Sequence, residues 1–297
     1  MVGTALTSFL TGRGHSVIIL SRRRGDKTGN GAITYMQWDI KMQTIDPLAI
    51  TGADYIIHLA GASVFAKRWT KKYKKEIENS RVQSSRLLLQ ALRTYPHKIK
   101  AIVSSSATGW YGADKNAGQA FTEDDAPADD FLGQVCMQWE QSINEASSLG
   151  IPVIKLRTGI VLSNKGGFLE PLKKALRFGI AAIPGNGRQI ISWIHIEDLC
   201  RMFLFAAEKE NIEGSFNAVA SMPVSMKALS IQYAGSLNKK FIAIYIPAFV
   251  LRVLLGSRSV ETTKSVTVSN TLAKSKGFQF LYPSVDAALQ ALATDRS

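Results

Sequence analysis

The sequence predicts an α/β protein with a Rossmann-type doubly wound parallel sheet and a small C-terminal α/β substrate lobe. One observation is that short apolar runs alternate with longer amphipathic segments, which is the pattern of βαβ units. A second is the segment AIVSSSATGWYG at 101–112, in which a buried strand breaks into three serines. Because ligands of open α/β sheets collect beyond the carboxyl ends of the strands, these hydroxyls predict a nucleotide-cofactor protein.

The elements of the first half follow from hydrophobic periodicity and from Gly and Pro signals. Helices are expected at 2–10, 71–93 and 131–148, and strands at 16–21, 33–38, 55–59, 99–104 and 153–157. This order predicts a cofactor-binding domain over residues 1–160, to which later segments can return.

The rhythm loosens beyond residue 160, and residues 161–297 are expected to form the substrate lobe. We expect a helix from Gly166-Gly167 to Phe178, and a turn, a short strand and a helix start within 185–199. A smaller C-terminal domain is expected from about residue 246, ending in a strand, a turn and a helix at 277–292.

Composition excludes several classes of protein. Cys136 and Cys200 lie far apart without metal-ligand or disulfide spacing, so we expect no metal and a cytoplasmic protein. The apolar stretch 241–256 is shorter than the roughly 20 residues of a membrane helix, so it is interpreted as core and no membrane role is expected. No secretory signal is visible at the start.

The net charge of +13 gathers partly at 22–24 and 67–75. The second run continues into the helix expected at 71–93, which favours a solvated helical face over a nucleic-acid surface.

The front of the chain lacks a strand before its first helix. Met1-Val2-Gly3 fits the last glycine of a GxxGxxG loop, so Gly3 is a candidate cofactor contact, and we expect that the central strand and most of the loop are missing through truncation. The alternative for Gly3 is a flexible terminus.

Ser21 ends the strand at 16–21 and Arg22 follows it, at the place where a dinucleotide protein contacts the adenosine ribose. Arginine pairs with a 2′-phosphate, whereas an acidic residue would bind a free 2′-hydroxyl, so Arg22 to Arg24 favour NADP over NAD. A solvated basic turn is the alternative.

The chain resembles the extended short-chain dehydrogenases/reductases, and within them the NAD-dependent epimerase/dehydratase-like branch that carries a C-terminal domain of unknown function. The stretches that carry the resemblance span nearly the whole chain: IIHLAGA at 56–62, RWTKKYKKEIENSRVQSSRLL at 68–88, SSSATGWYG at 104–112, FTEDDAPADDFLGQVCMQWE at 121–140, KLRTGIVLS at 155–163, GNGRQIISWIHIEDL at 185–199 and GFQF at 277–280.

The resemblance implies a set of cofactor contacts. Arg22 would take the 2′-phosphate, Asp39 would lie near the adenine, and Ser104 would lie beside the nicotinamide. The ribose, the pyrophosphate and the carboxamide would be lined by the remaining candidates, which are Leu59, Ala60, Gly61, Arg157 and Thr158. Asp39 has a turn cap as its alternative role, and Gly61 has close packing.

The resemblance also implies catalytic residues, and here the chain departs from the superfamily. Ser106 matches the active-site serine, but Leu132 and Cys136 occupy the positions of the usual tyrosine and lysine. Leucine has no proton to exchange, and cysteine on a largely apolar helix is more typically a small buried hydrophobe. Tyr111, which could equally brace its loop, is the second catalytic candidate.

Substrate contacts are expected from Arg188, Gln189, Trp193 and His195. His195 precedes an acidic helix start, so a structural role competes with a general-base role. The acidic residues at 123–125 lack ligand convergence and are interpreted as solvated or capping.

Together these patterns predict an NADP-binding oxidoreductase or epimerase-like enzyme acting on a small hydroxyl or carbonyl compound. The alternative is an NADP-binding sensor or scaffold that has lost hydride chemistry. A homodimer is left open, and the substrate is not predicted.

Overall fold

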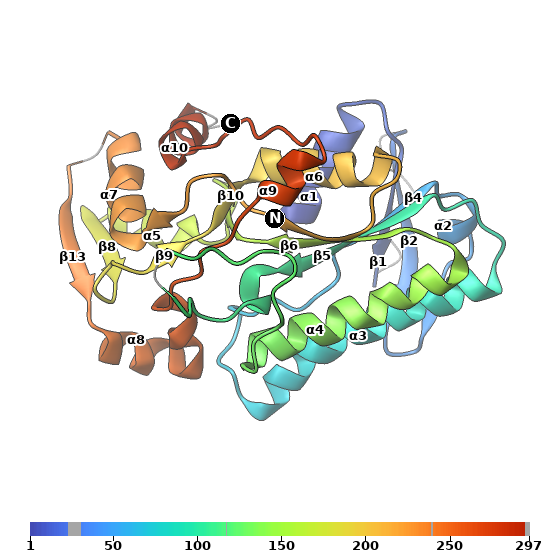
Figure 1. The fold of residues 1–297 in the computed structure, drawn as a ribbon, viewed down its shortest axis with the longest axis horizontal. Helices are drawn as coiled ribbons and strands as arrows, with labels where there is room; N and C mark the ends of the chain where they lie inside the picture. The colour runs from blue at the N-terminus through green and yellow to red at the C-terminus, as the bar shows by residue number, and fades with distance from the viewer. Residues whose placement is uncertain (23–30, 117, 239, 295–297) are drawn as a thin grey trace.

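The computed structural model describes residues 1–22, 31–116, 118–238 and 240–294 (Figure 1). Its central sheet has four parallel strands in the order β11-β6-β5-β4. Their bounds are β4 Tyr55–His58, β5 Ala101–Ala107, β6 Val153–Thr158 and β11 Gly214–Ala218. The parallel sheet and its covering helices confirm the predicted fold class.

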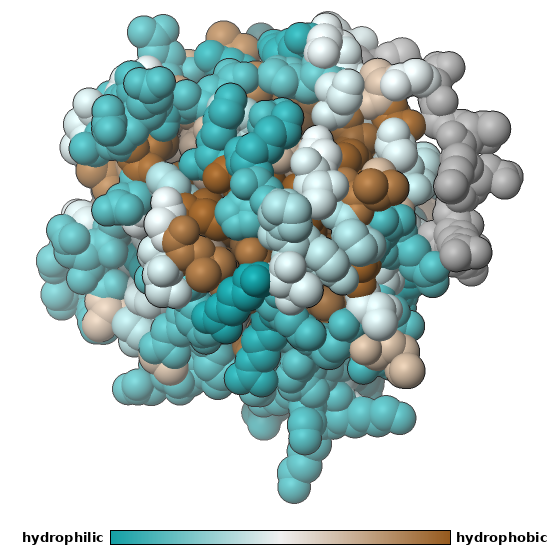
Figure 2. All heavy atoms as spheres, turned by 90° about the vertical axis from the view of Figure 1, so that its right-hand side faces the viewer, coloured by the Kyte–Doolittle hydropathy of each residue, from teal (hydrophilic) through white to brown (hydrophobic). Residues whose placement is uncertain are grey.

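A second ladder holds the strands nearest the N-terminus. β1 (Val17–Ser21) pairs in parallel with β2 (Ile33–Asp39), and β3 (Thr44–Ile45) pairs antiparallel with β2. Within the described ranges no ladder joins β1 to β4, although Leu20 and Ile56 pack against one core cluster. Figure 2 views the side of the molecule that carries β1 and β2, and apolar side chains gather in the middle of this face.

Helices cover both faces of the central sheet (Figure 1). One face carries α3 (Lys71–Thr94) and α4 (Phe131–Asn144), with α2 (Leu48–Thr51) nearby; the other carries α1 (Val2–Thr11), α6 (Ile196–Glu208) and α9 (Thr271–Ser275). Side-chain caps start the two long helices, since Thr70 accepts from the Tyr73 amide and Asp130 from the Gly133 amide.

The C-terminal lobe is built from short ladders and helices around Trp193, Leu229 and Leu289. Its strand pairs are β7 (Ile160–Leu162) with β10 (Trp193–His195), β8 (Ile180–Pro184) with β13 (Ile242–Ile246), and β9 (Ile190–Ile191) with β12 (Val224–Ser225). Its helices are α5 Leu169–Leu176, α7 Met226–Ser236, α8 Ala248–Leu255 and α10 Val285–Thr294, and the 3-10 segments of the chain are η1 Thr108–Trp110, η2 Glu145–Leu149 and η3 Gly256–Thr262.

Segments beyond residue 160 also pack on the central sheet. β11 pairs with β6, α6 covers one face, and Ala273 and Phe278 enter the same core cluster. The division of the chain at residue 160 stays a prediction.

Two local predictions are wrong. The stretch 241–256 is not core: Ile242 is 72% exposed and Phe249 71% exposed, because β13 lies at the edge of a two-stranded ladder and α8 follows it outward. Residues 277–280 form no strand, because Phe278 packs edge-to-face against Phe205 and Phe280 rather than pairing with a neighbouring strand.

No helix in the described part of the chain combines the length and apolarity needed to cross a bilayer.

Candidate functional site at the carboxyl edge of the sheet

The carboxyl ends of β4, β5, β6 and β11 meet at one edge of the sheet, because all four strands are parallel. Leu59, Ala60 and Gly61 follow β4 directly, and Thr158 ends β6. A Cβ on Gly3, in the first turn of α1, would lie 3.8 Å from Leu59 Cδ1. The structure therefore brings Gly3 close to the turn that follows β4, although the two segments are far apart in the sequence.

The α1 N-terminus carries no side-chain cap and no acidic residue in its first turn. Uncapped amides at a helix start favour an anion, and Gly3 leaves them uncovered. This end of the helix therefore suits the phosphate group of a ligand.

Register places polar side chains in two rows across the sheet. Ser106, Arg157 and Asn217 are aligned on β5, β6 and β11. Two residues earlier on the same strands, the second row holds His58, Ser104, Lys155 and Ser215. Because side chains two residues apart share a face, both rows lie on one side of the sheet.

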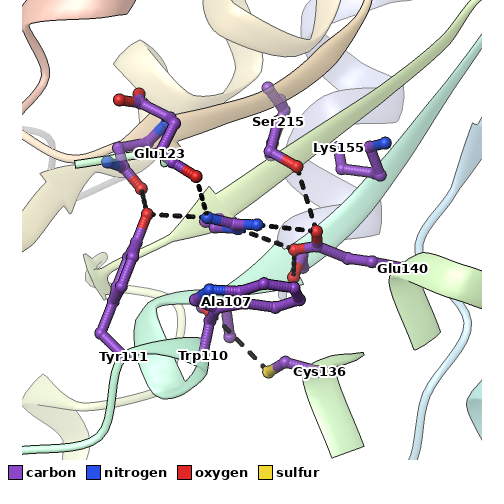
Figure 3. A network of polar contacts seen from close by, with 12 residues as sticks. Ala107, Trp110, Tyr111, Glu123, Cys136, Glu140, Lys155 and Ser215 are labelled. Carbon is purple, nitrogen blue, oxygen red and sulfur yellow. Dashed lines mark hydrogen bonds and ion pairs between the residues drawn. The ribbon is translucent and has the colours of Figure 1, made fainter. Parts of the chain in front are cut away.

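Glu140 of α4 joins the first row into a buried network (Figure 3). Its Oε1 accepts from Arg157 Nε at 2.9 Å and from Ser106 Oγ at 2.6 Å. Its Oε2 accepts from Arg157 Nη2 at 3.0 Å and from Ser215 Oγ at 3.0 Å. The ion pair is almost fully buried, and its four hydrogen bonds offset the desolvation of the carboxylate.

Tyr111 lies on the opposite side of this network from Glu140 in Figure 3. Its hydroxyl donates to Asn217 Oδ1 at 2.6 Å and accepts from Arg157 Nη1 at 3.1 Å. Burial raises the pKa of Tyr111 to about 12, so the phenol keeps its proton at neutral pH.

Two further contacts close this part of the network. Arg157 Cζ lies 3.8 Å from the centre of the Trp110 ring, which covers the guanidinium. The Glu123 carboxylate accepts a hydrogen bond from the backbone N–H of Asn217 at 2.8 Å. The side chain of Glu123 is therefore bonded to the protein, whereas residues 123–125 were expected to be solvated or to cap a turn.

The two predicted catalytic hydroxyls are thus brought together around one ion pair. Ser106 is 2% exposed and Tyr111 1% exposed, and each donates its proton to a protein acceptor. Their catalytic roles stay a prediction, but the structure shows that Arg157 and Glu140 set the position of both side chains.

A second buried network surrounds His58. Ser84 Oγ donates to backbone carbonyls of its own helix, so it accepts from His58 Nε2 at 2.8 Å. Trp139 Nε1 then donates to His58 Nδ1 at 3.5 Å, and Ser104 Oγ, which donates to the Ser105 carbonyl at 3.1 Å, lies 3.3 Å from the same nitrogen. Burial, and secondly the charge of Arg81, lower the pKa of His58 to about 4, so the imidazole is neutral. The Ser104 side chain belongs to this network and is fully buried.

Leu132 and Cys136, at the tyrosine and lysine positions, face η1. A Cβ on Gly109 would lie 3.2 Å from Leu132 Cβ and 3.8 Å from Cys136 Sγ. Burial raises the pKa of the Cys136 thiol to about 12, and Sγ donates weakly to the Ala107 carbonyl. Neither side chain exchanges a proton at neutral pH.

The candidates at the adenosine end are spread over two strands. Ser21 ends β1 and Arg22 follows it with an exposed side chain, while Arg23 and Arg24 lie outside the described residues. Asp39 ends β2 and accepts from the amides of Lys41 and Met42, which is the turn-capping alternative.

Three of the four predicted substrate residues are buried against protein partners. Gln189 donates to the carbonyls of Pro184 and Thr262, and Trp193 donates to Met222. His195, the third buried residue, caps α6 by accepting from the Glu197 backbone amide. Arg188, the fourth, is exposed. As substrate contacts, all four stay predictions.

Sequence reasoning missed Glu140, Ser215 and Asn217 as network residues. A signal existed for the first, because a glutamate on the apolar face of one helix and an arginine within the apolar strand 153–158 each need a buried counter-charge. No comparable signal marks the serine or the asparagine.

Comparison with protein-family models gives two matches. Residues 1–218 match the NAD dependent epimerase/dehydratase family, and residues 246–292 match a domain of unknown function, DUF1731. Among curated proteins, the chain is 33% identical over 296 residues to the epimerase family protein YfhF of Bacillus subtilis, covering 99% of this chain and 95% of that protein. It is 28% identical over 291 residues to the epimerase family protein Mb2239 of Mycobacterium bovis, covering 97% and 93%.

Solved structures show the same fold. The human epimerase family protein SDR39U1 with NADPH matches with a TM-score of 0.85 and 25% identity, over 99% of this chain and 96% of that chain. A nucleoside-diphosphate sugar epimerase from Corynebacterium glutamicum matches with a TM-score of 0.76 and 28% identity, over 99% of this chain and 56% of that chain.

Proposed function

This chain belongs to the NAD-dependent epimerase/dehydratase family, and from that premise we propose that it binds NADP and acts as an oxidoreductase or epimerase on a small hydroxyl- or carbonyl-bearing substrate. The observation that carries the proposal is the carboxyl edge of the sheet, where the first turn of α1 meets the turn at 59–61. The NADPH of the human relative supports the choice of cofactor.

The residues at this edge fit a dinucleotide. Gly3 leaves the first turn of α1 open to close approach, and the uncapped start of α1 favours a diphosphate. Gly61, in the turn after β4, has the Arg81 guanidinium against it, with Cζ 3.0 Å from where a Cβ would lie. Arg22, exposed after β1, would take the 2′-phosphate, with Ser21 beside it. Leu59, Ala60, Ser104, Arg157 and Thr158 stay in the proposed cofactor set on the strength of the family resemblance.

A bound nicotinamide supplies hydride exchange, and the chain supplies positioning and proton handling. Ser106 is the better placed of the two catalytic candidates, because Glu140 holds its proton while its oxygen keeps lone pairs to accept a bond from a substrate hydroxyl. Tyr111 has its oxygen engaged by both Asn217 and Arg157, so we assign it a positioning role.

Calorimetric titration of the full chain with NADPH and with NADH tests the cofactor assignment. NADPH is expected to bind more tightly than NADH, and Arg22→Glu is expected to abolish that preference. An unchanged NADPH affinity in this variant refutes the 2′-phosphate role of Arg22. Saturable binding of neither dinucleotide refutes the proposed function.

A second candidate function is an NADP-binding sensor or scaffold without hydride chemistry. The presence of Leu132 and of a Cys136 thiol with a raised pKa favours it. The two candidates separate when NADPH oxidation is followed with a panel of carbonyl compounds, and when epimer formation from a panel of nucleotide sugars is followed by chromatography. Turnover in either assay supports the enzyme, and tight binding without turnover supports the sensor.

A further inference from the structure

The exposed apolar side chains of this chain gather largely in one place. Among the described residues, eight of the fifteen large apolar side chains that are exposed are Phe65 and seven members of the stretch 242–260. On α8, Phe249 is 71% exposed and Val253, one turn later, is 69% exposed, while Leu251 is buried on the opposite side of the helix. A helix that is apolar on its outer face as well as its inner face is typical of one that is covered on both sides.

Hydrogen bonds join this stretch to the loop that precedes α3. Arg68 Nη2, in the loop, donates to the Val253 carbonyl at 2.6 Å. In the opposite direction, Arg258 Nη1 donates to the Phe65 carbonyl at 2.5 Å. The loop and the stretch therefore lie side by side and form one surface, and in Figure 1 its helix α8 lies at the outer end of the lobe, below β13.

Every formal charge on this surface is positive. Residues 63–72 and 240–260, which we call the apolar-basic surface, contain seven Lys or Arg residues and no Asp or Glu. Lys67 pairs with Glu76 of α3, and among the described residues the other six cations form no ion pair. Arg252 is one of the six and is exposed on α8, among the apolar side chains. The surface therefore suits a partner that offers negative charge and an apolar phase together.

An anionic lipid bilayer meets both requirements. Apolar side chains enter the boundary between headgroups and acyl chains to a depth of about 5–10 Å, and arginine and lysine reach back to the phosphates. The eight residues of α8 span about 12 Å, which is enough to lie in that boundary and too little to cross a bilayer. The expectation that 241–256 has no membrane role rests on the length needed for crossing, and binding at the surface sets no such length.

Three other occupants fit less well. A second copy of the chain would set positive charges against positive charges, without a carboxylate on either surface to pair them. A nucleic acid would satisfy the cations, but the exposed aliphatic side chains of Ile242, Val253 and Leu254 have no counterpart among phosphates and bases, which favour planar aromatic contacts. An acidic protein would have to bury Arg252 within an apolar contact, whereas a hydrated headgroup layer leaves this charge in a polar environment.

We propose that the apolar-basic surface docks this protein on a membrane surface that contains anionic phospholipids. Phe249 and Val253 enter the interface, and Arg252 contacts the lipid phosphates beside them. The docking is separate from the proposed function, because none of these side chains belongs to the proposed cofactor, catalytic or substrate residues.

The test is sedimentation of the full chain with vesicles, made either of phosphatidylcholine alone or of an equal mixture of phosphatidylcholine and phosphatidylglycerol. The variant Phe249→Ser/Val253→Ser removes apolar contact, and Arg252→Gln removes charge. The matched controls are Leu48→Ser, at a residue of α2 that is 64% exposed, and Arg93→Gln, at the opposite end of α3 from the loop. The Tm of each variant is measured beside the binding, and it should stay close to that of the wild type because all five positions are exposed.

The wild type is expected to bind the mixed vesicles and not those of phosphatidylcholine alone, with an affinity that falls as salt is added. Phe249→Ser/Val253→Ser should lower the affinity for mixed vesicles by about 10-fold or more, and Arg252→Gln should lower it by about 5-fold. Both control variants should bind as the wild type does.

A fluorescent label reports insertion without removing a charge or an aromatic ring from the surface. Cys136 and Cys200 are buried, so an environment-sensitive dye attaches selectively to the Val253→Cys protein and, as its control, to the Leu48→Cys protein. On mixed vesicles the emission of the dye at position 253 should shift to shorter wavelength, and the emission at position 48 should not shift. This measurement decides the proposal even where a serine variant fails to fold.

Wild-type protein that does not bind the mixed vesicles, or a dye at position 253 that keeps its emission on them, overturns the proposal. Vesicle binding that Phe249→Ser/Val253→Ser leaves unchanged does so as well. Two further results overturn it by identifying another occupant. Dimers that form without vesicle binding and that the same double variant disperses assign the surface to a second copy. Binding of a DNA duplex without vesicle binding, weakened by Arg252→Gln, assigns it to a nucleic acid.

Discussion

Replacing Glu140 with glutamine is expected to destabilise the protein more than any surface change. The substitution preserves shape and removes the charge that faces Arg157. In the wild type, the carboxylate accepts two hydrogen bonds from the guanidinium and one each from Ser106 and Ser215. Glutamine presents an NH2 group to some of these donors, so at least one buried donor loses its acceptor.

The size of the expected stability loss depends on how deeply the pair is buried and on which hydrogen bonds Arg157 retains. The side chains of the pair are 4% and 8% exposed, so solvent does not replace the lost charge. Arg157 retains bonds to the Tyr111 hydroxyl and the Glu123 carbonyl. Removing one partner of a buried pair costs about 3–5 kcal/mol, and the retained bonds place the expected loss near 3 kcal/mol. That loss corresponds to a fall in Tm of about 5 °C for a chain of 297 residues.

Denaturant unfolding and thermal melts of Glu140→Leu, Arg157→Met and their double variant Glu140→Leu/Arg157→Met measure the coupling, and Glu140→Gln is measured beside them. The double variant should lose less stability than the sum of the two single changes, because it leaves no unpaired charge. Lys174→Gln, in an exposed pair with Glu170, is the control and should shift stability by less than about 0.5 kcal/mol. Additive losses, or a Glu140→Gln protein as stable as the control, would show that the pair is not the stabilising unit described.

Three further outcomes are expected. The pKa of His58 falls from its ordinary value of 6.5 to about 4 in the folded protein, so below pH 6.5 the unfolded chain binds more protons than the folded chain. Stability present above pH 6.5 should therefore be lost by up to roughly 3 kcal/mol as the pH falls toward 4. Measurements of Tm against pH should show no such loss in His58→Asn. Gly133→Ala should lower stability by about 1–3 kcal/mol because its Cβ would collide with the Ala128 carbonyl, whereas Gly235→Ala, with open space around it on α7, should be neutral or slightly stabilising in the same melt. The Cys136 thiol should resist iodoacetamide in the folded protein at neutral pH and react on unfolding, and mass spectrometry of rapid labelling in the native state would reveal the contrary.

The fold was predictable because its signals are local. The strand 153–158 alternates the apolar Ile154 and Leu156 with Lys155 and Arg157, and the helix at 71–94 repeats its apolar positions with helical spacing after a threonine cap. The stretch 241–256 was misjudged for a related reason: hydrophobicity alone does not distinguish a core segment from an edge strand and a helix that face outward.

The sequence was sufficient to predict where the site lies in the chain, but not which residues contact one another within it. Ser106 and Tyr111 were singled out from the strand-to-turn pattern at 101–112, but their partners come from α4, β6 and β11. These contacts depend on the register of three strands, which places Ser106, Arg157 and Asn217 in one row. Register follows from the packing of the whole sheet, so no local sequence pattern specifies these contacts.

The charges around Cys136 suit a neutral side chain at the position where the family resemblance implies a lysine. The electrostatic neighbours of Cys136 include Glu140, Arg81 and Arg157, and Glu140 is already neutralised by Arg157. A lysine at this position would add a third cation opposite a single carboxylate, and Arg81 would repel it. The charges around Cys136 therefore favour an uncharged side chain at this position of α4.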